Sequence, residues 1–297
     1  LIVNPLPVAN PASPIFICSD GTSTTTGSFD LTIRNNEITG GATGVTVSYH
    51  LTQADANNGV NALPIPYTNI INGQIVYARV QNTATGCFNT TTLQLNVVPG
   101  PVPGSVTPLQ VCDANNDGFA VFDLTQAGVA ASAGNPDYLI AYFETFDDAD
   151  FGASANQITN PSAYNSVNNA NQTVYIRVTS QTTGCHVVVA VTLVANPTPE
   201  ATTPDNLTQC DDNTDGIGVF NLNAVIPQVL GSISAATHAV SFHSTEAAAI
   251  AGNPSINNTN AYSNTTPNQE IVWVRVTNNT TGCFDVVSLT LVVHPNP

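Results

Sequence analysis

The chain has 297 residues, of which 42% are hydrophobic and only 8% are charged, and its formal net charge is −16. This length accommodates two or three domains, and the hydrophobic content is enough to build their cores. The acidic balance excludes nucleic acid and anionic lipid as electrostatic partners, because both attract basic surfaces. No run approaches the roughly 18 apolar residues of a transmembrane helix, so we expect no direct membrane insertion.

Three repeats with a period of 98 residues organise the sequence, and such repeats decide the architecture before any other feature. Cys87, Cys185 and Cys283 mark the period, because each stands in a Thr-Gly-Cys motif. The linkers between repeats are rich in proline and are expected to act as semi-rigid spacers. The expected domains are residues 1–98, of which 1–7 are the tail of a preceding repeat, 99–196 and 197–297.

Within a repeat, the expected elements are short strands. Residues 44–49, 75–80 and 91–97 alternate β-branched or aromatic residues with polar ones, which is typical of half-buried strands. A connection rich in turn-forming residues joins the last two as a hairpin. Short helical turns are expected at residues 52–56 and 125–130. About seven short strands in each repeat predict an all-β fold of three tandem immunoglobulin-like β-sandwich domains.

Each repeat carries one pair of cysteines, and we expect one disulfide inside each domain. Closing a loop of about 70 residues contributes roughly 4 kcal/mol in the chain-entropy model. Buried free thiols are the alternative, but paired spacing in three repeats favours disulfides and an oxidising compartment. The expected pairs tie the start of each domain to its final hairpin, and they are Cys18–Cys87, Cys112–Cys185 and Cys210–Cys283.

Two acidic loops follow the first cysteine of repeats 2 and 3. Oxygen-bearing side chains at the first, third and fifth loop positions, with glycine at the sixth, are how calcium loops of the EF-hand type begin. The glutamate that completes such a loop is missing, so a polar turn closed by Asx hydrogen bonds is the alternative. The candidate Ca²⁺ ligands are Asp113, Asn115, Asp117, Phe119 and Asp123 in repeat 2, and Asp211, Asn213, Asp215, Ile217 and Asn221 in repeat 3.

The matching loop of repeat 1 is shorter. Between Cys18 and Thr22 it holds a single carboxylate, Asp20, so we expect no calcium in repeat 1. Calcium bound in the other two repeats would stiffen the junction between successive domains or stabilise each repeat internally; the sequence favours neither.

Three of the four arginines share one repeat position, on the strand that precedes the Thr-Gly-Cys motif. Arg79, Arg177 and Arg275 are expected to be structural, each pairing with a carboxylate such as Asp30 or Asp123 or with backbone carbonyls. Binding of an acidic glycan is the alternative role. The chain has no lysine, so isopeptide bonds between lysine and asparagine cannot form, and disulfides and calcium must stabilise the domains instead.

The sequence offers little for catalysis. It contains no nucleophile elbow, His-Glu-x-x-His motif or phosphate-binding glycine loop, and we expect that the protein is not an enzyme. Glu144, Asp147, Asp148 and Asp150 cluster in repeat 2 only. We interpret this cluster as a solvated acidic loop or a second, weak cation site.

Four motifs together resemble a known repeat. They are the Cys-Asp-x-Asn-x-Asp-Gly loop with the Phe-Asp-Leu that follows it, the segment from Val47 to Ala56, the Val-Tyr-x-Arg-Val strand and Thr-Thr-Gly-Cys-Phe. The whole chain is similar to the tandem repeats of giant cell-surface proteins of Bacteroidota, especially flavobacteria. These include adhesins related to the gliding-motility adhesin SprB, which the type IX secretion system exports. The resemblance implies an extracellular, cell-surface protein with an adhesive or filament-forming role.

We therefore expect a structural segment of a surface adhesin or extracellular filament. It would form a semi-rigid stalk, stabilised by calcium and disulfides, whose partners are neighbouring repeats of the same long chain. The alternative is a module that recognises surface glycans or another cell-surface protein through loops at the sandwich ends. That alternative requires an exposed aromatic cluster in one repeat, and the single tryptophan, Trp273, gives it little support.

Overall fold

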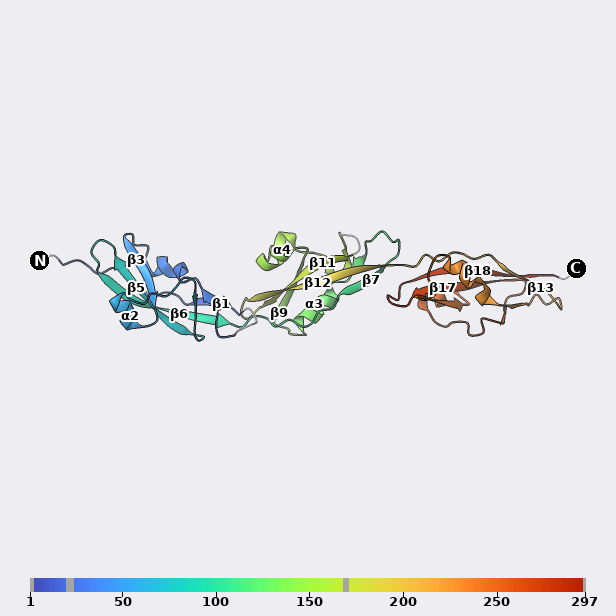
Figure 1. The fold of residues 1–297 in the computed structure, drawn as a ribbon, viewed down its shortest axis with the longest axis horizontal. Coiled ribbons are helices and arrows are strands. Elements are labelled where there is room, and N and C mark those ends of the chain that lie inside the picture. The colour runs from blue at the N-terminus through green and yellow to red at the C-terminus, as the bar shows by residue number, and fades with distance from the viewer. Residues whose placement is uncertain (1–2, 20–23, 168–170, 296–297) are drawn as a thin grey trace. The chain divides into compact units, whose positions relative to one another are not determined.

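A computed structural model describes residues 3–19, 24–167 and 171–295 of the chain (Figure 1). It contains three copies of one arrangement, a four-stranded sheet accompanied by a two-stranded sheet. Two compact units divide the strands of repeat 2 between them. One unit is Leu1–Thr107, Leu124–Pro161 and Thr173–Val191, and the other is Pro108–Asp123, Ser162–Gln172 and Thr192–Pro297.

In repeat 1 the four-stranded sheet has the order β1-β6-β5-β3, and the two-stranded sheet pairs β2 with β4. The third, fifth and sixth strands thus share one sheet while the second and fourth form the other, as in an immunoglobulin-like sandwich. The elements of repeat 1 are β1 (Ile15–Cys18), β2 (Ser28–Phe29), η1 (Leu31–Arg34), α1 (Asn35–Thr39), β3 (Val45–His50), α2 (Gln53–Asn58), β4 (Tyr67–Thr68), β5 (Gln74–Asn82) and β6 (Phe88–Val98).

Repeats 2 and 3 have the same strand order, β7-β12-β11-β9 and β13-β18-β17-β15. The elements of repeat 2 are β7 (Leu109–Asp113), β8 (Val121–Phe122), α3 (Thr125–Ser132), β9 (Tyr138–Phe143), α4 (Phe146–Phe151), η2 (Ser154–Asn156), η3 (Pro161–Ala163), β10 (Tyr164–Asn165), β11 (Asn171–Ser180) and β12 (His186–Pro197). Those of repeat 3 are β13 (Leu207–Cys210), β14 (Val219–Phe220), η4 (Leu222–Val225), α5 (Ile226–Leu230), β15 (His238–His243), α6 (Glu246–Ala251), β16 (Tyr262–Ser263), β17 (Gln269–Asn278) and β18 (Phe284–His294).

Alternation along the long strands builds the core, as the sequence predicts. Val76, Ala78 and Val80 of β5 are fully buried, and in β6 Leu93 and Leu95 are buried while Gln94 is exposed. Since successive side chains of a strand point to opposite faces, one face of each sheet is apolar. The fold class of three immunoglobulin-like β-sandwich domains is confirmed, although the described residues of each repeat form six strands and not seven.

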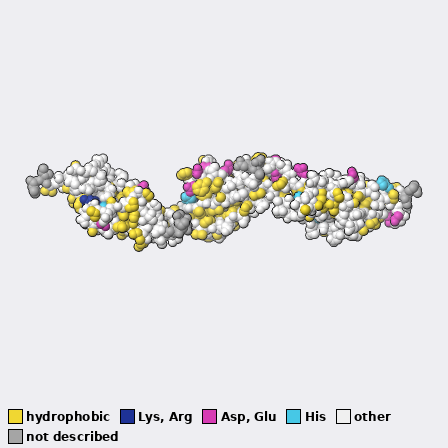
Figure 2. Space-filling view, in the orientation of Figure 1, with side chains coloured by type: hydrophobic (Ala, Val, Ile, Leu, Met, Phe, Trp, Pro, Cys, Tyr) yellow, Lys and Arg dark blue, Asp and Glu magenta, His cyan; other side chains and the backbone are white. Residues whose placement is uncertain are grey.

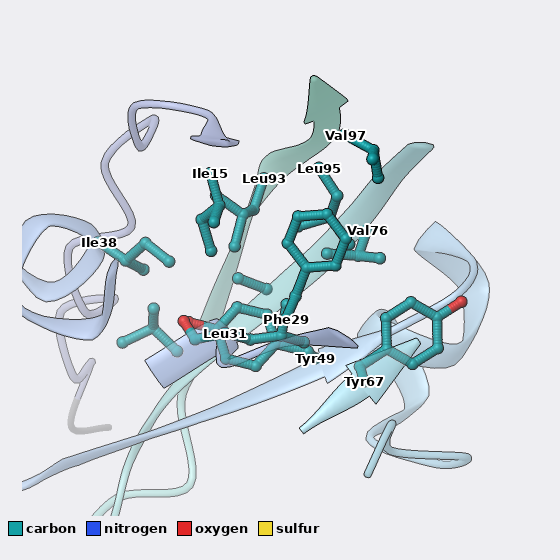
Figure 3. Close-up of a cluster of buried hydrophobic side chains, with 12 residues drawn as sticks. Ile15, Phe29, Leu31, Ile38, Tyr49, Tyr67, Val76, Leu93, Leu95 and Val97 are labelled. Atoms are coloured by element: carbon teal, nitrogen blue, oxygen red, sulfur yellow. The ribbon is translucent and has the colours of Figure 1, made fainter. Parts of the chain in front are cut away.

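The core of repeat 1 packs Phe29 and Leu31 from the short-sheet side against the large sheet (Figure 3). Tyr49 of β3 reaches into this cluster, and its hydroxyl lies 2.8 Å from the Leu31 carbonyl and 2.6 Å from Asn35 Oδ1, the two acceptors that share its proton. Burial, assisted by the charge of Asp30, raises the pKa of Tyr49 well above its ordinary value. A buried hydroxyl with two acceptors fixes the short helices to the sheet at little energetic cost.

The described helices are short. None of them has both the length and the apolar character that a membrane crossing requires.

Candidate functional site

The two cysteines of repeat 1 lie at opposite ends of its last strand. β1 runs parallel to β6, and their register places Cys18 beside Val98, where β6 ends. Cys87 immediately precedes Phe88, where β6 begins. A strand of 11 residues is about 35 Å long. The two sulfur atoms therefore cannot meet, since a disulfide needs Cα atoms roughly 4.4–6.8 Å apart.

The same register recurs in the other repeats. Cys112 of β7 lies beside Asn196 near the end of β12, and Cys210 of β13 lies beside His294 at the end of β18. Cys185 and Cys283 each precede the first residue of those last strands. Each repeat thus carries one cysteine at each end of its last strand.

The disulfides connect consecutive repeats. Cys18 bonds to Cys185 and Cys112 bonds to Cys283, with Cα–Cα distances of 5.5 Å in both. Cys87 is a half-buried thiol and Cys210 an exposed one. The expected pairs Cys18–Cys87, Cys112–Cys185 and Cys210–Cys283 are therefore wrong, and so is the expectation of one disulfide inside each domain. The parallel first strand is the reason, because it carries the first cysteine away from the second.

The spacing of the cysteines is equally compatible with disulfides inside a repeat and disulfides between consecutive repeats. A period of 98 residues moves the second cysteine into the next repeat without changing its motif, so one pair per repeat fits both schemes. The available signal was the position of Cys87 at the very start of the last strand. Any first strand that runs parallel to that strand ends far from Cys87.

A tight turn presents the second cysteine. In repeat 1, Asn82 Oδ1 accepts hydrogen bonds from the backbone nitrogens of Ala84 and Thr85, both at 3.0 Å. Thr85 Oγ1 then accepts from the nitrogen of Cys87 at 3.3 Å. Gly86 has φ +72°, a conformation that glycine adopts without a steric penalty. The Thr-Gly-Cys motif is therefore the sequence of a turn that fixes the direction of the cysteine.

Side chains near the second cysteine also hold the proline-rich linker. Thr183 Oγ1 donates to the carbonyl of Pro99 at 3.3 Å, two residues before Cys185. At the next linker, the nitrogen of Ala201 donates to the carboxylate of Asp285 at 2.9 Å, two residues after Cys283. The linker is thus fixed by hydrogen bonds close to each disulfide.

The candidate calcium loops are closed by hydrogen bonds of their own. Asp113 is only 3% exposed, and its Oδ2 accepts from the nitrogen of Gly118 at 2.6 Å. Asn115 Nδ2 donates to Asp117 Oδ2 at 2.7 Å, so these two side chains converge. This is the network expected of an Asx-type polar turn.

The loop of repeat 3 is closed by the same hydrogen-bond network. Asp211 accepts from the nitrogens of Gly216 and Thr214, both at 2.8 Å, and Asn213 Nδ2 donates to Asp215 Oδ2 at 2.9 Å. Although burial opposes its ionisation, the backbone N–H donors keep the pKa of Asp211 below the ordinary value. The loop therefore holds a buried, ionised carboxylate.

The remaining candidate ligands have other surroundings. Asn221 caps η4 by accepting from the nitrogen of Asn223 at 3.1 Å. Asp123 occupies the same repeat position as Asn221.

The two candidate backbone ligands lie next to the loop carboxylates. The nitrogens of Phe119 and Ile217 donate to Asp117 and Asp215, both at 2.8 Å. Within the described part of the chain, no three His, Cys, Asp or Glu residues are grouped so that they could hold a metal ion. Asp20 of the repeat 1 loop lies outside the described residues.

The loop of repeat 2 contacts the linker to repeat 3. Asn116 has φ +56°, a left-handed backbone conformation that asparagine adopts more readily than most residues. Its Oδ1 accepts from the nitrogen of Thr198 at 2.7 Å, and its Nδ2 donates to the carbonyl of Thr198 at 3.0 Å and to Glu200 at 3.1 Å. Thr198 Oγ1 also donates to the carbonyl of Asp113. The loop therefore fixes the linker through an amide that sequence reasoning did not single out.

The three equivalent arginines bind helix ends. Arg79 Nη1 donates to the carbonyls of Ala56 and Asn57 at 2.8 and 2.9 Å. Arg177 makes the corresponding bonds to α4, and Arg275 makes them to α6. Backbone carbonyls, one of the two partners considered above, are thus what these side chains contact. A cation at the carbonyl end of a helix is stabilised by the helix dipole and satisfies carbonyls that have no partner in the helix.

Aromatic rings support two of these arginines. The guanidinium carbon of Arg79 lies 3.5 Å from the ring centroid of Phe88, and that of Arg275 lies 3.3 Å from the centroid of Phe284. Repeat 2 has His186 at this position, and its Nε2 lies 3.0 Å from Asp150 Oδ1. The phenylalanine of the Thr-Thr-Gly-Cys-Phe motif is therefore the second half of a cation–π contact.

Comparison with solved structures gives chains of tandem domains at low similarity. Immunoglobulin domains 1–5 of Sidekick-1 share 9% identity, with a TM-score of 0.23 over 97% of this chain and 58% of that chain. Extracellular domains 3–5 of Drosophila OTK share 10% identity, with a TM-score of 0.24 over 97% and 99%. Drosophila N-cadherin EC1–3 shares 12% identity, with a TM-score of 0.22 over 97% and 99%. A comparison with curated proteins gives no match.

A family model named for the feature described above matches the chain three times. The matched segments are residues 14–101, 108–199 and 206–297, one in each repeat. Together they cover most of the sequence, and the family is named after a disulfide between domains, as seen here for Cys18–Cys185 and Cys112–Cys283. The chain belongs to the Flavobacterium inter-domain disulphide bond domain family, as three tandem copies.

Proposed function

We propose that this chain is a structural segment of an extracellular cell-surface adhesin or filament, in which disulfides link each repeat to the next. The position of the two cysteines at opposite ends of each last strand is the observation that supports this role. A cysteine at each end suits a repeat that is linked to a neighbour on both sides. Disulfides persist in oxidising compartments outside the cytoplasm, which agrees with a location at the cell surface.

The two thiols extend the scheme beyond these three repeats. Cys87 holds the repeat position of Cys185 and Cys283, which bond to a preceding repeat. Cys210 holds the position of Cys18 and Cys112, which bond to a following repeat. We infer that Cys87 and Cys210 form the same bonds to neighbouring repeats of a longer chain, so that every joint is closed by a linker and a disulfide.

The register of the sheets suits a stalk under tension. Force that reaches Cys185 through the disulfide passes along β12 toward the linker, and the direct hydrogen-bonded connection from β12 to Cys112 is its parallel pairing with β7. Five residue pairs make this ladder, from Leu109 with Leu193 to Asp113 with Pro197. Tension along both strands would shear all of these hydrogen bonds together, which requires more force than opening them one at a time.

Calcium is a second part of the proposal. The first three side-chain ligands of each loop, Asp113, Asn115 and Asp117 or Asp211, Asn213 and Asp215, supply two carboxylates and one carboxamide. The first carboxylate is already held by backbone N–H groups. Calcium prefers such hard oxygens, and affinity rises with the number of charged ligands. Two carboxylates per loop suit weak binding, with a dissociation constant of about 10⁻⁴ to 10⁻³ M, as in other extracellular modules. Bound calcium would rigidify the loop that holds the linker through Asn116.

Thermal unfolding tests the calcium proposal on the oxidised protein. The midpoint should rise as calcium increases from 1 to about 10 mM, following simple linkage, and EGTA should reverse the rise. The Asp117→Ala, Asp215→Ala double variant should lose the response. An equal response in this variant, or no response in the parent chain, would show that the two loops are polar turns without a metal.

Peptide mapping tests the proposed linkage. A longer natural stretch of the protein, collected from the cell surface and alkylated before digestion without reduction, should yield Cys210 cross-linked to a Thr-Gly-Cys peptide of the following repeat. Cys87 should be linked to the first cysteine of the preceding repeat. Recovery of both residues as alkylated thiols would contradict the proposal. Recovery of Cys18–Cys185 and Cys112–Cys283 in the same digest serves as the internal control.

A further inference from the structure

Helix α4 of repeat 2 exposes two aromatic rings that its counterparts lack, and it carries three acidic residues where each counterpart carries one. α4 reads Phe-Asp-Asp-Ala-Asp-Phe, whereas α2 reads Gln-Ala-Asp-Ala-Asn-Asn and α6 reads Glu-Ala-Ala-Ala-Ile-Ala. All three helices follow a capping threonine and bury the alanine at their fourth position. Phe146 is 50% exposed and Phe151 is 82% exposed. The repeats therefore share the buried side of this helix and differ on the side that faces solvent.

The exposed residues form one continuous surface. At about 100° per residue, Phe146, Asp150, Asp147 and Phe151 follow one another around roughly 140° of the helix. Ala149, which is fully buried, lies outside this arc. Figure 2 shows hydrophobic and acidic surface side by side over α4. We name these four residues, with Tyr175 behind them, the α4 patch.

Neighbouring residues hold the α4 patch in place. The ring of Phe146 packs edge-to-face on Tyr175, with centroids 5.9 Å apart. Asp150 Oδ1 lies 3.0 Å from His186 Nε2, and Arg177 Nη1 donates to the carbonyl of Asp150 at 2.5 Å. Thr145 caps the helix and donates to Asp148 Oδ2 at 2.6 Å. A surface that is already ordered loses little conformational entropy when a partner binds, which favours recognition.

The charge of the patch determines the kind of partner. Glu144, Asp147, Asp148 and Asp150 place four carboxylates within seven residues. The nearby guanidinium, that of Arg177, donates to helix carbonyls. Exposed rings between carboxylates suit arginine or lysine side chains, whose cation can lie on a ring face while it pairs with an acid. The complementary ligand is therefore cationic.

A second copy of this chain does not supply that complement. The chain has no lysine and four arginines against 20 acidic residues. Arg34 contacts Glu37 and the carbonyl of Pro14, and the other three donate to helix carbonyls. None of these arginines is left as a free basic surface. We propose that the α4 patch docks a basic segment of a different protein, with arginine or lysine side chains over Phe146 and Phe151.

Binding of a defined peptide to the oxidised full chain tests this proposal. The probe is a fluorescein-labelled peptide of eight alternating arginine and leucine residues, and its control carries citrulline in place of arginine. We expect the arginine peptide to bind about tenfold more tightly than the citrulline peptide, because cation–π contacts and ion pairs need the charge. Binding should weaken as salt is raised, since exposed charges are screened.

The repeats themselves provide the variants. Phe146→Gln, Asp147→Ala, Asp150→Asn and Phe151→Asn convert α4 into the sequence of α2 and should weaken binding about tenfold. Placing the α4 sequence at residues 53–58 of that variant should restore binding. A matched control, Asp212→Asn with Glu246→Gln, removes the same number of charges from exposed positions of repeat 3 and should leave binding unchanged. Unaltered thermal midpoints would show that all variants fold.

Three results would overturn the proposal. Equal loss of affinity in the repeat 3 control would show that the peptide senses only the total charge of the protein. Binding of a neutral oligosaccharide that depends on Phe146 and Phe151, without binding of the arginine peptide, would make α4 a glycan platform. Self-association that sedimentation detects, and that the α4 variant abolishes, would make the patch an interface between copies. None of these results bears on the disulfide linkage, which peptide mapping tests separately.

Discussion

Stretching single oxidised molecules from their two ends measures how the disulfides connect the repeats. With both bonds intact, the shortest covalent route does not follow the sequence. It runs from residue 1 to Cys18, crosses to Cys185, returns to Cys112, crosses to Cys283 and continues to residue 297. The three chain segments contain 17, 73 and 14 residue steps, 104 in total, whereas the reduced chain offers 296.

These steps set the maximum extension. At about 3.5 Å per residue, with one short span for each disulfide, the unfolded oxidised chain stops at roughly 375 Å and the reduced chain at roughly 1,040 Å. Force spectroscopy with handles on the two terminal residues measures both limits. Reduction after full extension should release the missing two thirds of the length. The difference arises only from the cross-linking pattern, so it does not depend on how stable each repeat is.

Single cysteine variants decide between pairing schemes. Cys87→Ser should leave the oxidised limit unchanged, because Cys87 is a thiol. Cys185→Ser removes one bond, and the route through Cys112–Cys283 then contains 125 steps, so the limit should rise by roughly 70 Å. If Cys87→Ser instead lengthened the chain by about 240 Å, a bond between Cys18 and Cys87 would exist. The whole account of linked repeats would then be refuted.

Three further predictions concern the repeats themselves. Arg79→Met should destabilise repeat 1 by about 3 kcal/mol in urea unfolding, because two charged hydrogen bonds and a ring contact are lost. A change below about 1 kcal/mol would mean that water replaces these contacts in the variant. Phe220 is 1% exposed, so Phe220→Ala leaves a cavity and should lower the free energy of unfolding by about 3–5 kcal/mol. Phe119 is 43% exposed, so Phe119→Ala should lower it little. Similar losses in the two variants would contradict the assignment of Phe220 to the core. Burial, together with the hydrogen bond to Glu270 and its charge, raises the pKa of Tyr262 from 10.0 to about 12. The unfolded chain then loses its phenolic proton first, so stability should hold up to a pH of about 10 and fall between about 10 and 12, and denaturant titrations of Tyr262→Phe should show a smaller fall.

Local sequence patterns determined the strands and the apolar face of each sheet. The expected strands at residues 44–49, 75–80 and 91–97 overlap β3, β5 and β6, and the buried Leu93 and Leu95 alternate with polar residues as expected. Side-chain alternation is a local property, because neighbouring residues of any strand point to opposite faces. Because the sequence repeats every 98 residues, the same strands were expected in the other two repeats.

The candidate site depended more on contacts that are distant in sequence. The motifs showed that Arg79, Arg177 and Arg275 share a role, but the helix carbonyls that they contact lie more than 20 residues away. Asn116 had no signal of its own, since its partners Thr198 and Glu200 belong to the following linker. Neither pairing follows from the types of residue, because asparagine and arginine have many possible partners.

The disulfide pattern separates what the sequence determined from what only the tertiary structure decided. Six cysteines in three equivalent pairs indicated an oxidised repeat protein, because periodicity and cysteine count are properties of the sequence alone. Partner choice required the direction of one short strand. Since β1 runs parallel to β6, Cys18 and Cys87 lie at opposite ends of a strand of 11 residues, and each can bond only outside its own repeat. The direction of β1 is set by its pairing with β6 in the folded sheet, and the spacing of the cysteines does not predict that direction.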